Sequence, residues 1–371
     1  MQKLFYFFAM AAMVLGMASC GDGNTPVNPI DQQAFTFRLA RLGDVAAAVV
    51  ITPTDPAAEY IIGYVTRDKV GSDEVLANYI EVNRLNGYTY KELVDNYVIM
   101  SGERYVAAND LAPNSECVFY ACQVDKDLNI INLGIEHVTT LEAGKLQGEF
   151  SIDAKGTKVR FSKGNLQAEY RDKTVTNVFR FAENQWDVLG EDNETAANHG
   201  SGWIDLHCWI YEYKVGFVDP GTYPITNGGN VANEWFTLSE EQMNYLLYSR
   251  ERASELMGIG YVKGITGLIL LPDNWDGSSL EEDNSFSNRE WWEMELKGAV
   301  FLPATGWCAG LDNISAPKEG YYWTSSIDTK SSSVSSLNPY LWLDENGIQM
   351  KKEMIIYHKR FAFRLVQYVE K

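Results

Sequence analysis

The side chains best suited to chemistry in this chain lie in one acidic loop with an aromatic residue at its centre. The loop comprises Asp273, Asn274, Trp275 and Asp276, followed closely by Glu281, Glu282 and Asp283. Carboxylate and amide oxygens are the ligands that Ca²⁺ prefers, but the EF-hand pattern needs an oxygen ligand where this loop has Trp275. Asp273 and Asp276 are therefore candidates for a Ca²⁺ site, although a solvated acidic loop is the favoured interpretation. We expect no resident cofactor.

Two tryptophans in loop-like sequence are candidates for contact with a ligand. Trp275 stands between Asn274 and Asp276, and Trp307 follows Gly306, so we expect both indoles to be exposed. Flat indole faces suit the apolar faces of sugars and the side chains of a protein partner. We therefore predict that Trp275, Trp307, Asn274 and Asp276 bind a ligand.

Familiar catalytic motifs are missing from the sequence. There is no Gly-x-Ser-x-Gly elbow, no His-Glu-x-x-His helix and no P-loop. His199 and His207 lie near Asp205, where polar loop or core roles are the simpler interpretation. The 50 acidic residues could supply a carboxylate pair for glycoside hydrolysis, but the sequence fixes no distance between any two of them. We therefore predict that the protein is not an enzyme.

The N-terminus has the pattern of a lipoprotein signal peptide. Lys3 precedes an apolar run from Leu4 to Leu15, and small residues then lead to Cys20. The run is too short for a membrane-spanning helix. We expect residues 1–19 to be removed, Cys20 to carry the lipid, and residues 20–33 to form a flexible tether. An ordinary secretory signal with a chance cysteine is the alternative.

The acidic composition limits the classes of partner. The formal net charge is −19, from 31 basic and 50 acidic residues. A chain this acidic repels the phosphates of nucleic acid and the surface of an anionic membrane. We expect no nucleic-acid partner and contact with the membrane through the N-terminal lipid alone.

Four cysteines remain besides Cys20. Cys117 and Cys122 have an odd separation within one expected strand, so they should point to opposite faces and remain separate buried thiols. Cys208 and Cys308 are either bridged or two thiols.

Residues 34–141 should form the first domain. The sequence predicts strands at 35–39, 46–52, 60–66, 117–124 and 130–138, and helices at 73–82 and after a capping box at Thr89–Glu92. Ser72 is the expected cap of the first helix. The segment from Leu111 to Cys117 resembles the Leu-x-Pro-Gly-Thr-x-Tyr corner of fibronectin type III domains, with Cys117 in place of the tyrosine. This resemblance implies an all-β sandwich of the immunoglobulin or fibronectin type III kind, with a helical insert.

A second domain is expected at residues 149–371, after a short linker at 142–148. All ten tryptophans lie beyond this linker. Overlapping caps within Thr237–Gln242, for a helix through Arg250, and a capping box at Ser287–Glu290 predict two helices among many short strands, which is typical of an α+β fold. Trp291 and Trp323 lie in regular elements, so we expect them in the core.

Six blocks of this second domain resemble a known family. They are Val159–Gln167, Phe179–Ala182, Leu270–Asn274, Phe301–Ala304, Gly320–Ser326 and Arg360–Val366. Their order is similar to that of the Fibrobacter major paralogous domain, which occurs in Bacteroidetes surface lipoproteins. The resemblance implies a C-type-lectin-like fold related to formylglycine-generating enzymes. The calcium-dependent sugar motifs of lectins are missing, and Cys308 has no neighbouring cysteine for the enzyme's catalytic pair.

Together these features predict a lipid-anchored binding protein of the cell envelope. We expect an outer membrane lipoprotein, at the cell surface or on the periplasmic face, whose C-terminal domain recognises a glycan or a surface protein. Two alternatives are a structural or accessory subunit of a surface assembly and a glycan-active enzyme.

Overall fold

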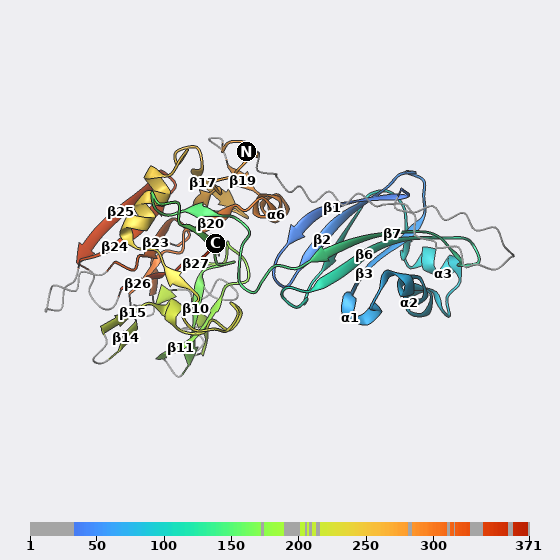
Figure 1. Ribbon diagram of the computed structural model, residues 1–371, viewed down its shortest axis with the longest axis horizontal. Helices are drawn as coiled ribbons and strands as arrows, with labels where there is room; N and C mark the ends of the chain where they lie inside the picture. The colour runs from blue at the N-terminus through green and yellow to red at the C-terminus, as the bar shows by residue number, and fades with distance from the viewer. Residues whose placement is uncertain are drawn as a thin grey trace, which may run out of the picture.

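The computed structural model describes residues 33–171, 174–188, 201–204, 206–207, 210–212, 216–280, 284–309, 312–314, 316–326, 337–354 and 359–369. The expected signal peptide, Cys20 and nearly all of the tether lie outside these residues, as do His199, Asp205 and Cys208. Most of the regular structure is β-strand, arranged in two lobes that lie side by side along the chain (Figure 1). Within the described part of the chain, no helix is long and apolar enough to cross a membrane.

The first lobe is a sandwich of two antiparallel sheets. The first sheet has the order β1 (Phe35–Leu42), β2 (Ala47–Pro53), β5 (Arg104–Ala108). The second has the order β4 (Ile99–Met100), β3 (Tyr60–Thr66), β6 (Glu116–Val124), β7 (Ile130–Thr139). Side chains from both sheets, among them Val49, Ile51 and Phe119, fill the core between them. The β-rich first lobe agrees with the sequence prediction.

Short helical segments cover the outer face of the second sheet. They are α1 (Arg67–Val70), a 3₁₀ turn (Asp73–Val75), α2 (Leu76–Ile80), a π-helical turn (Glu81–Leu85) and α3 (Tyr90–Asp95). The capping box of α3 is confirmed, because the Glu92 N–H donates to Thr89 Oγ1 and the Thr89 N–H donates to Glu92 Oε2. The single capped helix predicted at 73–82 is wrong. Ser72 makes no side-chain cap, so the segment begins as a 3₁₀ turn.

The described residues of the second lobe form four larger sheets and a small hairpin. The largest has the order β22 (Asp312–Ile314), β21 (Trp307–Ala309), β26 (Lys359–Ala362), β23 (Glu319–Trp323), β24 (Leu337–Asp344), β25 (Gly347–Met354), with β13 (Leu206–His207) also paired to β26. The second has the order β16 (Phe236–Thr237), β27 (Leu365–Tyr368), β9 (Lys158–Phe161), β8 (Phe150–Ser151). The third has the order β19 (Ser285–Phe286), β17 (Met257–Val262), β18 (Ile265–Leu270), β20 (Val300–Pro303).

The remaining strands and helices complete this lobe. The fourth sheet has the order β11 (Thr174–Phe181), β10 (Leu166–Arg171), β12 (Ser201–Ile204), and the hairpin joins β14 (Ile210–Glu212) to β15 (Gly216–Val218). The helical elements are a 3₁₀ turn (Pro220–Thr222), α5 (Glu240–Asn244) with a π-helical turn (Tyr245–Ser249), and α6 (Asn288–Leu296). Of the overlapping caps predicted at Thr237–Gln242, the structure uses the box on Ser239, and the predicted box on Ser287 is also present.

The expected linker is packed against both lobes rather than loose. Leu146 is 3% exposed and belongs to the core of the second lobe. Gly148 approaches Gly298 so closely that a Cβ there would lie 2.1 Å from the Gly298 carbonyl oxygen. Asp44, on the turn after β1, accepts hydrogen bonds from the Gly144 N–H and from Lys163 Nζ, and both side chains are buried. The junction therefore contains a buried ion pair that braces one lobe on the other.

The two described cysteines of β6 lie where the odd spacing predicts. Cys117 packs between the sheets, whereas Cys122 packs under the helical segments on the opposite face. Both are buried, unbridged thiols. Burial raises the pKa of Cys117 to about 11 and that of Cys122 to about 12. The thiolate that reacts with alkylating agents is therefore scarce at neutral pH.

We predict that iodoacetamide leaves Cys117 and Cys122 unmodified in the folded protein at pH 8. Both should become fully modified in guanidinium chloride, since unfolding restores solvent and an ordinary thiol pKa. Peptide mass mapping of the two reactions would measure this. Labelling of either residue in the folded chain would contradict its burial.

Candidate functional site

The acidic loop begins with Asp273, whose carboxylate bonds to residues from two other segments of the second lobe. Asp273 Oδ1 accepts from Arg250 Nη1 at 3.1 Å, and Oδ2 accepts from the N–H and hydroxyl of Ser151 at 2.9 and 2.6 Å. The Arg250 side chain is 1% exposed. A guanidinium buried this deeply requires a counter-charge, and Asp273 supplies it. Asp273 is therefore a structural brace between β8 and Arg250, the residue that follows the π-helical turn Tyr245–Ser249.

The predicted exposure of Trp275 is wrong. Its side chain is 6% exposed and packs in a cluster with Trp186, Trp291 and Phe301. The indole N–H donates to the Ser278 carbonyl at 3.0 Å, so the loop folds back over the ring and satisfies its polar atom. Loop-like flanking residues do not keep an indole in solvent, because burying its large apolar area is favourable. No stacking surface remains on Trp275.

The neighbouring candidates of this loop do not form a metal site among the described residues. Asn274 and Asp276 are exposed, whereas both Asp273 oxygens already accept from Arg250 and Ser151. In the part of the chain that the structure describes, no group of three histidine, cysteine, aspartate or glutamate side chains could hold an ion. Glu281, Glu282 and Asp283 lie outside it. The donor set of the described loop therefore does not fit Ca²⁺, which takes six to eight oxygens.

The other predicted tryptophan lies on an aromatic surface of the largest sheet. Trp307 is half-buried on β21. The pairing of Cys308 with Arg360 puts Trp307 on the same face as Phe361 of β26. The Tyr321 and Phe361 ring centroids are 5.1 Å apart, and Tyr321 pairs with Trp342 on β24. Trp307, Tyr321 and Trp342 therefore point to one face of the sheet.

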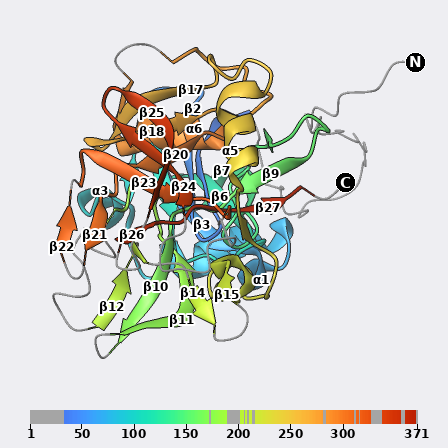
Figure 2. The same cartoon turned by 90° about the vertical axis from the view of Figure 1, so that its left-hand side faces the viewer.

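This aromatic face has some rings that are buried and others that are half-buried. Phe361, Trp323 and Tyr340 are buried. The Phe361 ring centroid lies 4.5 Å from that of Trp323 and 4.9 Å from that of Tyr340. Trp307, Tyr321 and Trp342 pack against these buried rings and keep part of their surface accessible. The strands that carry them lie side by side across the second lobe (Figure 2). Aliphatic side chains such as Leu341 and Leu343 occupy the opposite face.

Lysines accompany the two tryptophans. Lys351 Nζ lies 3.6 Å from the Trp342 ring centroid, and Lys359 Nζ lies 5.0 Å from that of Trp307. The Tyr321 hydroxyl donates to Glu319 Oε2 at 2.9 Å. Cation–π contacts at such partly exposed positions contribute about 0.5–1 kcal/mol, which a ligand can readily displace. The face thus combines stacking surfaces with donors and acceptors at its edge.

The sequence pattern predicts a ligand contact for Trp307 of this face but not for Trp342. Trp307 was predicted for its loop-like neighbours, although it lies in a strand. Trp342 was overlooked, yet Tyr340, Leu341, Trp342 and Leu343 alternate aromatic and aliphatic residues. This alternation indicates a strand with one aromatic face. What the sequence does not supply is the pairing that aligns Trp342 with Tyr321.

Comparison with models of known protein families and with curated proteins found no match for this chain.

The two aspartates of the acidic loop offer a matched test. We predict that Asp273→Asn lowers the free energy of unfolding by about 3–5 kcal/mol, because it leaves the Arg250 guanidinium buried without a counter-charge. Asp276→Asn, on an exposed side chain, should change stability by less than about 0.5 kcal/mol. Urea unfolding followed by tryptophan fluorescence would measure both. A chelator that destabilised the wild-type chain would contradict the brace interpretation.

Proposed function

We propose that this chain is a lipid-anchored binding protein of the cell envelope that recognises a glycan through the aromatic face of its second lobe. The observation that carries this proposal is the alignment of Trp307, Tyr321 and Trp342 on one face of a single sheet. We propose a binder rather than an enzyme.

The chemistry of the aromatic face suits a saccharide. Pyranose rings present flat C–H surfaces that pack on indole and phenol rings, while their hydroxyls require donors and acceptors at the edge. Lys351, Lys359 and Glu319 supply such groups beside the rings. A rigid, sheet-borne set of rings also loses little conformational entropy when a ligand binds.

A surface protein is the second partner class. Tyrosine and tryptophan are also enriched at the energetic centres of protein interfaces. A protein partner would use the same rings, and it would be recognised by crosslinking on intact cells rather than by sugar binding.

The strand order of the first lobe supports the first of the two domain types that the sequence resembles. A three-stranded sheet β1-β2-β5 facing a four-stranded sheet β4-β3-β6-β7 is the arrangement expected of a fibronectin type III-like domain. We propose that this lobe is such a domain and that the second lobe is C-type-lectin-like. The packed junction between them favours a stiff two-domain unit held off the outer membrane by the tether.

Anchoring can be tested through the proposed lipid attachment site. We predict that Cys20→Ala moves the protein from the membrane fraction to the soluble fraction of cells, since Cys20 is the only lipid attachment site we propose. Fractionation and immunoblotting would measure the shift. Continued membrane association of the variant would overturn the anchoring proposal, and protease shaving of intact cells would separate a surface from a periplasmic location.

Glycan recognition can be tested with matched tryptophan variants. A glycan array probed with the purified full chain, with Ca²⁺ and with chelator, should reveal a bound saccharide. Trp342→Ala and Trp307→Ala should each weaken its binding about tenfold, because a stacked ring contributes about 0.5–1.5 kcal/mol beyond its buried area.

The control is Trp203→Ala. Trp203 is also half-buried, and the Arg180 guanidinium carbon lies 4.4 Å from its ring centroid. However, Trp203 lies on β12, in a different sheet. It should leave binding unchanged. Equal effects of all three variants, or no bound glycan under either condition, would count against the aromatic face as a sugar site.

A further inference from the structure

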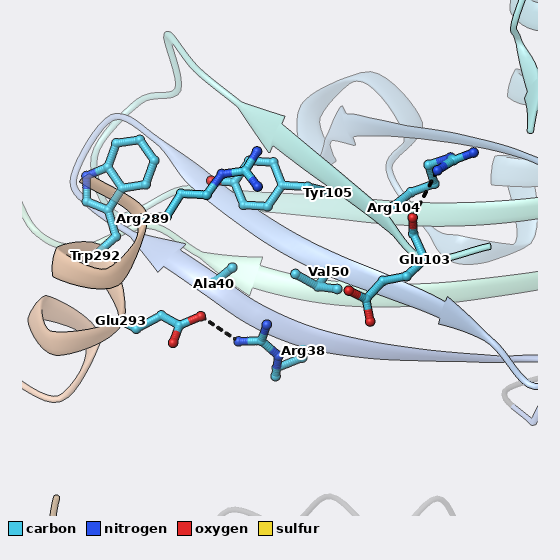
Figure 3. Close-up of a pocket in the computed structure, with 9 residues that line it drawn as sticks. All are labelled: Arg38, Ala40, Val50, Glu103, Arg104, Tyr105, Arg289, Trp292 and Glu293. Atoms are coloured by element: carbon cyan, nitrogen blue, oxygen red, sulfur yellow. Dashed lines mark hydrogen bonds and ion pairs between the residues drawn. The ribbon is translucent and has the colours of Figure 1, made fainter. Parts of the chain in front are cut away.

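A second candidate site lies in a pocket between the two lobes, separate from the aromatic face. Strands β1, β2 and β5 of the sandwich form one side, and the first two turns of α6 form the other (Figure 3). The cavity measures about 280 Å³. Pockets for small molecules begin at about 300 Å³, so this one suits a single sugar ring rather than a longer chain.

The pocket has an apolar floor and aromatic walls. Ala40 and Val50 are buried at its base. Tyr105 from β5 and Trp292 from α6 are half-buried and line the cavity, one from each lobe. Figure 3 shows both rings on the same side of the floor, with Arg289 reaching between the lobes to lie over Tyr105.

Arginines bring positive charge to this site in a strongly acidic chain. The Arg289 guanidinium carbon lies 4.4 Å from the Tyr105 ring centroid, and that of Arg41 lies 4.4 Å from Trp292. Stacking on a ring orients a guanidinium and leaves its edge free to donate two parallel hydrogen bonds, the geometry that matches a carboxylate. Arg38 and Arg104 also line the cavity.

The carboxylates of the pocket complete a set of groups that fits a sugar acid. Arg38 Nη1 pairs with Glu293 Oε1 at 3.0 Å, but the two side chains are 61% and 54% exposed, so this ion pair is weak and easily exchanged. Glu103 Oε2 accepts from the Thr52 hydroxyl at 3.0 Å, and its carboxylate can still accept from ligand hydroxyls.

We propose that this interlobe pocket binds one hexuronate ring, with its carboxylate on Arg289, its C–H face against Tyr105 and Trp292 and its hydroxyls toward Glu103. The proposal does not depend on the aromatic face, because no residue is shared between the two sites. A ligand here contacts both lobes and so stabilises their junction as well.

The test compares acidic and neutral sugars on the purified full chain. Glucuronate or galacturonate should bind, as measured by saturation-transfer NMR and titration calorimetry, with an affinity that falls as salt rises. Methyl glucoside should bind at least tenfold more weakly. Equal binding of the neutral sugar, or no binding of either uronate, would overturn the proposal.

Matched arginine variants locate the site. Arg289→Gln should weaken uronate binding about tenfold or more, whereas Arg252→Gln removes the same charge from an exposed side chain paired with Glu255 and should have no effect. Uronate binding that survives Arg289→Gln would place the ligand elsewhere and overturn the proposal. Circular dichroism should show both variants folded, because both side chains are exposed.

Two further measurements distinguish a free sugar acid from a residue within a glycan, and the interlobe pocket from the aromatic face. Binding of the free uronate supports a soluble sugar acid, and binding confined to an oligouronide supports a residue within a glycan, provided that Arg289→Gln abolishes either one. Trp342→Ala should leave uronate binding intact. Its loss in that variant would place the acid on the aromatic face instead.

Discussion

The second lobe depends on a buried arginine between its last two strands, which belong to different sheets. The chain runs from β26 in the largest sheet to β27 in another sheet, and Arg364 lies between them, 3% exposed. Its Nη2 donates to Gln185 Oε1 at 2.8 Å, and Gln185 Nε2 donates in turn to Glu295 Oε2 at 2.8 Å. Burial lowers the pKa of Arg364 to about 10 and raises that of Glu295. Such a charge is tolerated only where hydrogen bonds compensate its desolvation.

This network connects the two candidate sites through the fold. Glu295 lies in the last turn of α6, and the same helix carries Arg289 and Trp292 toward the sandwich. On the other side of Arg364, β26 supplies Phe361, a buried ring of the aromatic face. The Arg364 network thus connects the helix that lines the interlobe pocket with the strand that carries Phe361. Rigid elements of this kind hold a binding site more precisely than loops do.

Sequence reasoning succeeded where the signal is local. The capping boxes on Thr89, Ser239 and Ser287 each begin a helix, because the bonds that define them span three residues. The odd spacing of Cys117 and Cys122 gave opposite faces, because side chains alternate along a strand. The prediction for Trp275 failed because the indole packs with Trp186, Trp291 and Phe301, although its neighbours in sequence predict exposure.

The sequence by itself determined the β-rich character of the chain, the capped helices and the alternation of faces along single strands, all of which arise from contacts within a few residues. It also contains the pattern of a lipidated N-terminus. Only the tertiary structure decided which rings share a face, because strand pairing joins Trp307, Tyr321 and Trp342 across long sequence separations. It likewise decided that Asp273 pairs with Arg250, and that Arg289 of one lobe stacks on Tyr105 of the other. Such contacts depend on how whole elements pack, and local sequence patterns do not encode that packing.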